Sequence, residues 1–323
     1  MTTPTSTLLS TRKLSVGYGN HILLEELDLT MEGGKLICFM GPNGSGKSTL
    51  IRTLAGLHEP IKGQIMRMPG RDLHLQLAVV LTDRIASMNI SVQELIAFGR
   101  YPYLNWNVNL NEEDRAIIGR SIELVHLNHL IHKRLHELSD GQLQMVMIAR
   151  ALAQDTPLIL MDEPTAHLDL NNRLEMMNVL HNLTRSMNKA ILVATHELDL
   201  ALQTADEIWL AGNSRKIIRG IPEDLVLKGV FDDIFQFKGF DLKTGKVHHE
   251  INQQATIQLR GNSHEFLWTK NALERSGFSV TDKNASHLVA VVNENSNNTW
   301  VLDDDLQFTS IGDLLIHLNQ AGK

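Results

Sequence analysis

The chain has 323 residues, 43% of them apolar, a formal net charge of −7 and one cysteine, Cys38. The length accommodates two domains, the acidic balance argues against a nucleic-acid-binding scaffold, and one cysteine excludes an internal disulfide. Because the sequence has no run of about 18 apolar residues and no basic and apolar N-terminal region, we expect a cytoplasmic protein without a transmembrane helix or secretory signal.

The first part of the chain contains a predicted phosphate-binding loop. Residues 7–16 and 22–31 have the pattern of antiparallel strands, and residues 36–40 form an apolar run typical of a strand buried on both faces. Before the next helical pattern comes a glycine-rich segment, Gly41, Pro42, Asn43, Gly44, Ser45, Gly46, Lys47 and Ser48.

The residue types of this segment suit phosphate. Glycines let the backbone N–H groups turn inward to form an anion-binding nest, and the helix that follows adds its positive N-terminal end. Lys47 is predicted to reach the β- and γ-phosphates, and Ser48 is predicted to hold a magnesium ion.

Residues 86–155 are predicted to be largely helical and are followed by two more strands. The apolar run 158–161 ends at Asp162 and Glu163, and the run 190–195 ends at His196. In open α/β sheets, ligands collect at the carboxyl ends of the strands. Asp162 is therefore predicted to bind magnesium, Glu163 to serve as a general base for water, and His196 to hydrogen-bond the γ-phosphate.

Together these residues resemble the nucleotide-binding subunit of ATP-binding cassette (ABC) transporters over residues 8–240. Residues 138–142 resemble the signature sequence, residues 166–169 the D-loop, and Tyr18 the aromatic residue that stacks on adenine. The resemblance implies that ATP is bound by Tyr18 and residues 41–48, with Thr49, Ser139, Gly141, Gln142 and Asp169.

The resemblance also implies an α/β fold. The expected architecture is a P-loop NTPase (RecA-like) core with an antiparallel β subdomain and a helical insert at about residues 86–155. In that family ATP binds between two copies, so that the signature helix of one faces the phosphate loop of the other. We therefore expect an ATP-sandwich homodimer with ATP and Mg²⁺ as cofactors.

Residues 91–103 resemble more narrowly the import ATPases for ferric siderophores, haem and cobalamin. This implies an ATP-hydrolysing subunit that lies on the inner face of the cell membrane. Its expected partners are membrane permease subunits and, indirectly, a substrate-binding protein. The alternatives are an ABC ATPase for another substrate and a soluble non-transport ABC ATPase.

Two departures from the family pattern stand near the site. Thr82 occupies the position of a glutamine that normally helps to hold magnesium; its hydroxyl, or the carboxylate of Asp83, is the candidate replacement. Asp140 replaces a glycine of the signature, and we expect it to point outward and stabilise the helix N-terminus.

Two further features stay open. Tyr101, Tyr103 and Trp106 fit either core packing or a surface for the permease. Residues 249–323, beyond an ATPase domain of residues 1–248, are predicted to form a small α+β domain with the order β-α-β-β-β-α. Its role is predicted to be ligand sensing, dimer stabilisation or none.

Overall fold

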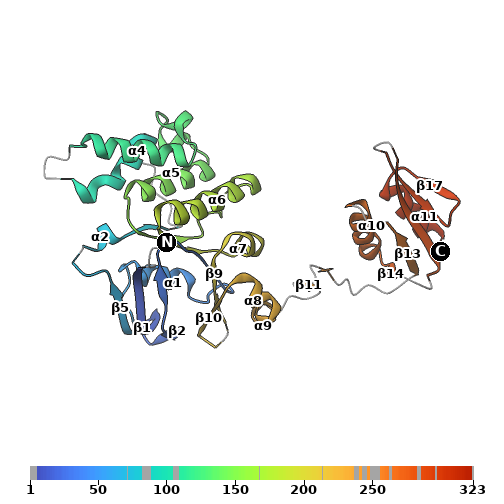
Figure 1. The fold of residues 1–323 in the computed structure, drawn as a ribbon, viewed down its shortest axis with the longest axis horizontal. Helices are drawn as coiled ribbons and strands as arrows, with labels where there is room; N and C mark the ends of the chain where they lie inside the picture. Colours follow the sequence, from blue (N-terminus) through green and yellow to red (C-terminus); the bar gives the residue numbers. More distant parts are fainter. Residues whose placement is uncertain are drawn as a thin grey trace, which may run out of the picture. The chain divides into compact units, whose positions relative to one another are not determined.

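The structure is a computed structural model that describes residues 6–321 except 71, 82–88, 105–108, 167, 213, 236–239, 242–245, 248–254, 262–263, 282–284 and 295–296. The chain divides into two compact units, Met1–Gln236 and Phe237–Lys323 (Figure 1). The boundary predicted after residue 248 falls beside residues outside the described part and stays a prediction.

The first unit begins with an antiparallel sheet in which β1 pairs with the three other strands. Its strands are β1 (Thr7–Tyr18), β2 (His21–Leu27), β3 (Thr30–Glu32) and β5 (Lys62–Arg67). Leu9, Leu14 and Val16 of β1 are buried, whereas Arg12 and Lys13 are exposed. One face of this sheet therefore contributes to a core.

A six-stranded sheet with the order β10-β9-β4-β8-β7-β6 forms the centre of this unit. The strands are β4 (Leu36–Met40), β6 (Leu77–Val80), β7 (Leu158–Asp162), β8 (Ala190–Ala194), β9 (Glu207–Ala211) and β10 (Ile217–Gly220). All neighbouring pairs are parallel except β9 and β10. Every residue of β4, β7 and β8 is buried, which fits their apolar sequences, interrupted only by Asp162 at the end of β7.

Helices connect these strands and form the insert. Outside the insert lie α1 (Lys47–Leu54), α2 (Leu73–Gln76), α6 (Leu170–Met187), α7 (Leu198–Thr204), α8 (Pro222–Leu227) and α9 (Val230–Phe235). The insert contains α3 (Val92–Ala97), η1 (Phe98–Tyr103), α4 (Glu112–Leu124), η2 (Asn128–Leu130), η3 (Leu135–Glu137) and α5 (Asp140–Ala153). Its helices α3, α4 and α5 begin with capping boxes at Ser91, Asn111 and Ser139.

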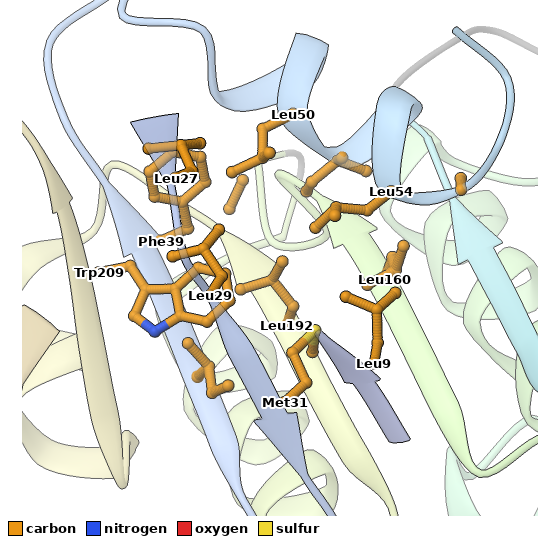
Figure 2. Packing of buried hydrophobic residues seen from close by; sticks show 14 of the residues in the cluster. Leu9, Leu27, Leu29, Met31, Phe39, Leu50, Leu54, Leu160, Leu192 and Trp209 are labelled. Atoms are coloured by element: carbon orange, nitrogen blue, oxygen red, sulfur yellow. The ribbon is translucent and has the colours of Figure 1, made fainter. Parts of the chain in front are cut away.

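The antiparallel sheet, the six-stranded sheet and α1 share one hydrophobic core, part of which Figure 2 shows. Leu27 and Leu29 belong to this core together with Leu50 of α1, and Phe39 of β4 lies edge-on to Trp209 of β9 with ring centroids 6.5 Å apart. This common core fixes α1, and with it the loop before α1, against β4. The predicted α/β P-loop fold with its antiparallel subdomain and helical insert is confirmed.

The second unit is the predicted small α+β domain. Its five-stranded sheet has the order β14-β13-β15-β16-β17. The elements are β13 (Thr256–Arg260), α10 (His264–Arg275), β14 (Ser279–Thr281), β15 (His287–Glu294), β16 (Asn297–Leu302), β17 (Leu306–Phe308) and α11 (Ile311–Ala321). Leu273 of α10 and Leu314 of α11 pack with Val289 and Trp300 in one core. A short antiparallel pair, β11 (Phe240–Asp241) with β12 (Lys246–Val247), precedes them.

Sequence reasoning missed β17, a three-residue strand that follows the turn Asp303–Asp305. No helix in the described part of the chain is long and apolar enough to span a membrane.

Candidate functional site: a nucleotide site at the carboxyl edge of the sheet

Three central parallel strands deliver the predicted site residues to one edge. Phe39 of β4 and Asp162 of β7 both pair with Ala194 of β8, so these strands end at the same level. The phosphate loop follows β4, Glu163 follows β7, and His196 follows β8 by two residues. This arrangement is the one that α/β sheets use for ligands.

The loop between β4 and α1 has a backbone that favours glycine. Gly41, Gly44 and Gly46 have φ angles of 157°, 79° and 95°. A Cβ atom on Gly41 would lie 2.8 Å from Ser45 Oγ and 2.9 Å from the carbonyl oxygen of Ala211. Between the glycines, Ser45 N–H donates to the Pro42 carbonyl at 3.2 Å, and Asn43 is exposed. The tight turn predicted for residues 41–46 is therefore present.

Lys47 opens α1 directly behind this loop. Its Nζ donates to the carbonyl oxygens of Gly41 at 2.8 Å and Pro42 at 3.1 Å, so the amine lies across the loop. Burial lowers the pKa of Lys47, while the nearby charges of Glu163 and Asp162 act in the opposite direction. A cation is thus placed between the loop carbonyls and two carboxylates.

Ser48 and Asp162 provide oxygen atoms suited to a magnesium ion. Asp162 is 1% exposed, and burial raises its pKa, although a side-chain hydrogen bond from Ser48 lowers it in part. Among the described residues, Asp162 Oδ1 and Ser45 Oγ are buried without a hydrogen-bond partner. Because a buried carboxylate oxygen is normally satisfied, this unpartnered oxygen beside a hydroxyl fits a hard divalent cation.

Glu163 and His196 face one another at the same edge. His196 Nδ1 lies 3.5 Å from Glu163 Oε1, and both side chains are partly exposed. Glu163 has a φ of 47°, which is uncommon for a residue other than glycine, and its N–H donates to the Ala194 carbonyl at 2.9 Å. A carboxylate held beside an imidazole in a strained turn can accept a proton from water.

Tyr18 lies beside the phosphate loop at the end of β1. The Thr49 hydroxyl of α1 is 3.5 Å from Tyr18 Oη, and the ring of His58 lies 4.9 Å from the tyrosine ring between centroids. The Tyr18 side chain is 56% exposed. An exposed aromatic ring so close to α1 suits stacking on a base.

The signature residues lie on the insert. Ser139 caps α5: its Oγ accepts from the Gln142 N–H at 3.2 Å, and its own N–H donates to Gln142 Oε1 at 3.1 Å. Asp140 is exposed in the first turn and Gly141 follows it. Among the described residues, no hydrogen bond or ion pair joins Ser139, Gly141 or Gln142 to the phosphate loop. These two parts of the predicted ATP site lie on different elements, the phosphate loop before α1 and the signature at the start of α5.

Asp169 caps α6 by accepting from the Asn172 N–H at 2.9 Å. Sequence reasoning assigned no role to Arg173, in the first turn of α6, or to Glu197, with which Arg173 forms an ion pair at 2.9 Å. The positions of Arg173, four residues after Asp169, and of Glu197, directly after His196, are the signals that could have identified them.

Four residues of the predictions lie outside the part of the chain that the structure describes. They are the magnesium candidate Thr82, its neighbour Asp83, His167 of the D-loop and Trp106.

The aromatic residues of the insert fall into two kinds. Tyr103 Oη donates to the Gln154 carbonyl at 2.8 Å, and its ring lies 3.9 Å from the guanidinium of Arg100, which is itself buried against Asp114. Tyr101 is 51% exposed and contacts only the ring of Phe98 among the described aromatic residues. Tyr103, which is 39% exposed, is thus held against the insert by its hydroxyl and its ring, whereas about half of Tyr101 is exposed.

Fold and site together define a P-loop nucleotide-binding protein. Residues 24–166 match the family described as ABC transporter, and residues 254–319 match the Iron ABC transporter C-terminal domain. The chain is 38% identical over 238 residues to an uncharacterized ABC transporter ATP-binding protein of Methanocaldococcus jannaschii, covering 72% of this chain and 82% of that protein. It belongs to the ATP-binding cassette family of ABC transporters, whose members are ATPases that bind ATP.

Named relatives include transport proteins for iron complexes. The achromobactin transport ATP-binding protein of Dickeya dadantii is 33% identical over 237 residues, covering 71% of this chain and 88% of its own length. The ferric enterobactin transport ATP-binding protein of Escherichia coli is 29% identical over 230 residues, with coverages of 69% and 85%. A solved transporter classed as metal-chelate type, in an inward-facing conformation, superposes with a TM-score of 0.63 at 27% identity, covering 71% of this chain and 89% of that one.

Proposed function

We propose that the chain is the ATP-hydrolysing subunit of an importer for an iron complex such as a ferric siderophore. The observation that carries the ATPase part is the convergence of Lys47, Asp162, Glu163 and His196 at one edge of the sheet. The iron part is supported by the names of the relatives and by the match of residues 254–319 to an iron transporter domain.

In the proposed mechanism, the loop N–H groups and Lys47 hold the β- and γ-phosphates of ATP. Ser48 and Asp162, with Thr82 as a further candidate, would hold Mg²⁺, which neutralises charge on the phosphates when bound. Tyr18 stacks on the adenine base. The Glu163 carboxylate orients water and accepts its proton, and His196 donates a hydrogen bond to the γ-phosphate.

We further propose that a second copy completes the site. Ser139 and Gly141 sit at the N-terminus of α5, whose N–H groups and dipole favour an anion. In a two-fold dimer this end of one copy would face the γ-phosphate bound by the other, with Gln142 and Asp169 nearby. The exposed position of Ser139 and Asp140 at the start of α5 supports this proposal, because a second copy can reach this end of the helix.

The ATPase proposal is tested with the purified full chain. We expect Lys47→Ala to lose ATP binding, and Glu163→Gln to bind ATP but turn it over at least about 100-fold more slowly, because it removes the base. Gel filtration of Glu163→Gln with ATP and Mg²⁺ should show a dimer. Parent-like turnover in both variants would refute the assigned roles.

The transport proposal is tested by growth of cells. Deletion of the gene should abolish growth on one defined iron source, ferric siderophore or haem, and the Lys47→Ala chain should fail to restore it. Loss of growth only on cobalamin would assign that substrate instead, and parent-like growth on all three would refute import of this class.

The exposed Tyr101 is the proposed contact for the permease. The variant Tyr101→Ala should therefore keep ATP turnover and lose transport.

We propose dimer stabilisation or regulation as the role of residues 249–323. A chain that lacks residues 250–323 should change in dimerisation or in ATP turnover. If dimerisation, turnover and transport all stay unchanged, the domain has neither role.

A further inference from the structure

Arg173, in the first turn of α6, bridges two loops of the site. Its Nε donates to the Leu168 carbonyl at 2.6 Å, and its Nη1 lies 2.9 Å from Glu197 Oε1. Leu168 belongs to the loop that leads to Asp169, and Glu197 directly follows His196. One guanidinium therefore joins the D-loop to the loop that carries the proposed γ-phosphate sensor.

Glu197 is the buried end of this bridge. Its side chain is 10% exposed, compared with 31% for Arg173. Besides Arg173, Glu197 Oε1 accepts a hydrogen bond from the hydroxyl of Thr165 at 3.4 Å, and its N–H donates to Thr195 Oγ1 at 3.1 Å. Thr165 lies two residues after Glu163, so the carboxylate of Glu197 also ties down the turn behind the proposed base.

Two contacts thus connect the same two loops in parallel. Glu163 meets His196 at 3.5 Å, and Thr165 meets Glu197 at 3.4 Å. The first contact joins two partly exposed side chains. The second is the more buried of the two and sets the spacing of the loops.

The charge of Arg173 is what keeps Glu197 in place. A carboxylate that is nine-tenths buried is costly unless a cation compensates it, and among the described residues Arg173 is the cation in contact with it. The Thr165 hydroxyl alone is a weak substitute. Without Arg173, Glu197 has to take up a proton or turn toward solvent, and either change releases the loop of His196.

We propose that Arg173 is a positioning residue for hydrolysis, which couples the D-loop to His196 through Glu197. In the proposed dimer, the D-loop is the segment that places Asp169 near the second copy. A movement of the D-loop would displace Arg173 and, through Glu197, change the distance between Glu163 and His196. The inference rests on the proposed function, because it takes the roles of these two residues from it.

The test measures kcat, KM for ATP and Tm in the purified full chain. We expect Arg173→Met to lower kcat by about tenfold or more while KM changes by less than about threefold, since small misplacements of catalytic groups slow the chemical step. Arg185→Met is the matched control. Arg185 is on the same helix and also pairs with a largely buried carboxylate, Asp206, but at the end of α6 far in sequence from the D-loop. It should keep the parent kcat even if Tm falls.

A double-mutant cycle and a conservative variant complete the test. Because Arg173 and Glu197 act as one unit, Arg173→Met with Glu197→Gln should lose no more kcat than the worse single variant. Arg173→Lys keeps the charge but cannot serve both acceptors in the same geometry, so it should fold with a near-parent Tm and still lose kcat.

The outcomes separate the two proposals. The inference is overturned if Arg173→Lys and Arg173→Met both keep the kcat of the parent. It is also overturned if the losses of kcat in the double-mutant cycle are additive. Either result leaves the proposed function standing. A parent chain without ATP turnover would overturn both.

Discussion

Gly99 marks the contact between η1 and α5, and a single methyl group there should disturb the insert. A Cβ atom on Gly99 would lie 2.3 Å from the carbonyl oxygen of Arg150 and 3.0 Å from Ala153 Cβ and from the Gln154 nitrogen. The first distance is about 1 Å shorter than ordinary contact, and two of the three atoms are backbone. No side-chain rotation relieves the clash, so η1 and α5 have to separate in Gly99→Ala.

The expected magnitude follows from this overpacking. Such insertions cost about 1–3 kcal/mol. For a domain of about 150–250 residues, each kcal/mol lowers Tm by about 2–4 °C, so we expect a decrease of about 2–12 °C. Because the signature residue Ser139 caps α5, ATP turnover should fall as well.

Gly119 provides the matched control, because it lies within α4 and a Cβ atom there would meet nothing within 4 Å. Gly119→Ala should raise stability by about 0.5–1 kcal/mol through helix propensity alone. The measurement is the Tm of the two variants and of the parent in the absence of nucleotide. Equal stability of Gly99→Ala and the parent, or equal decreases in both variants, would refute the packing argument.

Three further results are expected. Burial raises the pKa of Asp162. The contribution of the Asp162 carboxyl to stability is therefore fully present below its pKa in the unfolded chain, about 3.9, and is lost as the pH rises through its pKa in the folded chain. Asp162→Asn should therefore raise the nucleotide-free Tm near neutral pH but not in acid, and abolish magnesium-dependent turnover; an unchanged difference across the pH series would contradict this. Tyr103→Phe removes the bond to the Gln154 carbonyl and should cost about 0.5–1.5 kcal/mol in denaturant unfolding, whereas Tyr101→Phe should cost nothing measurable. Burial raises the pKa of Cys38 to about 12, so a thiol reagent at pH about 8 should label it only after unfolding.

The parts of the fold that the sequence predicted are those with strong local signals. The glycines of residues 41–46 and the apolar runs of β4, β7 and β8 each identify an element without knowledge of its neighbours. The strand β17 has no such signal, because three residues are too few for an alternating pattern. It exists because Leu306 and Phe308 pair with Leu302 and Trp300 after a turn in which Asp303 has a positive φ.

The pair of Arg173 and Glu197 escaped sequence reasoning for a different reason. Each residue by itself is an ordinary charged side chain near the start of a helix. They meet because β7 and β8 are neighbours in the sheet, which brings together the loops that follow these strands. Sheet order is a property of the whole domain, so the contact follows from the fold and not from spacing along the chain.

The two adjacent carboxylates show what the backbone adds to a correctly located motif. The sequence placed Asp162 and Glu163 at the end of β7, but two roles require that the side chains reach different surroundings. The left-handed turn at Glu163 separates them: Asp162 stays buried beside Ser48, and Glu163 faces His196. Such a conformation costs about 1–3 kcal/mol, and the bond from Glu163 N–H to the Ala194 carbonyl helps to hold it. The proposed division between a metal ligand and a base therefore depends on a strained peptide that the residue pattern alone does not encode.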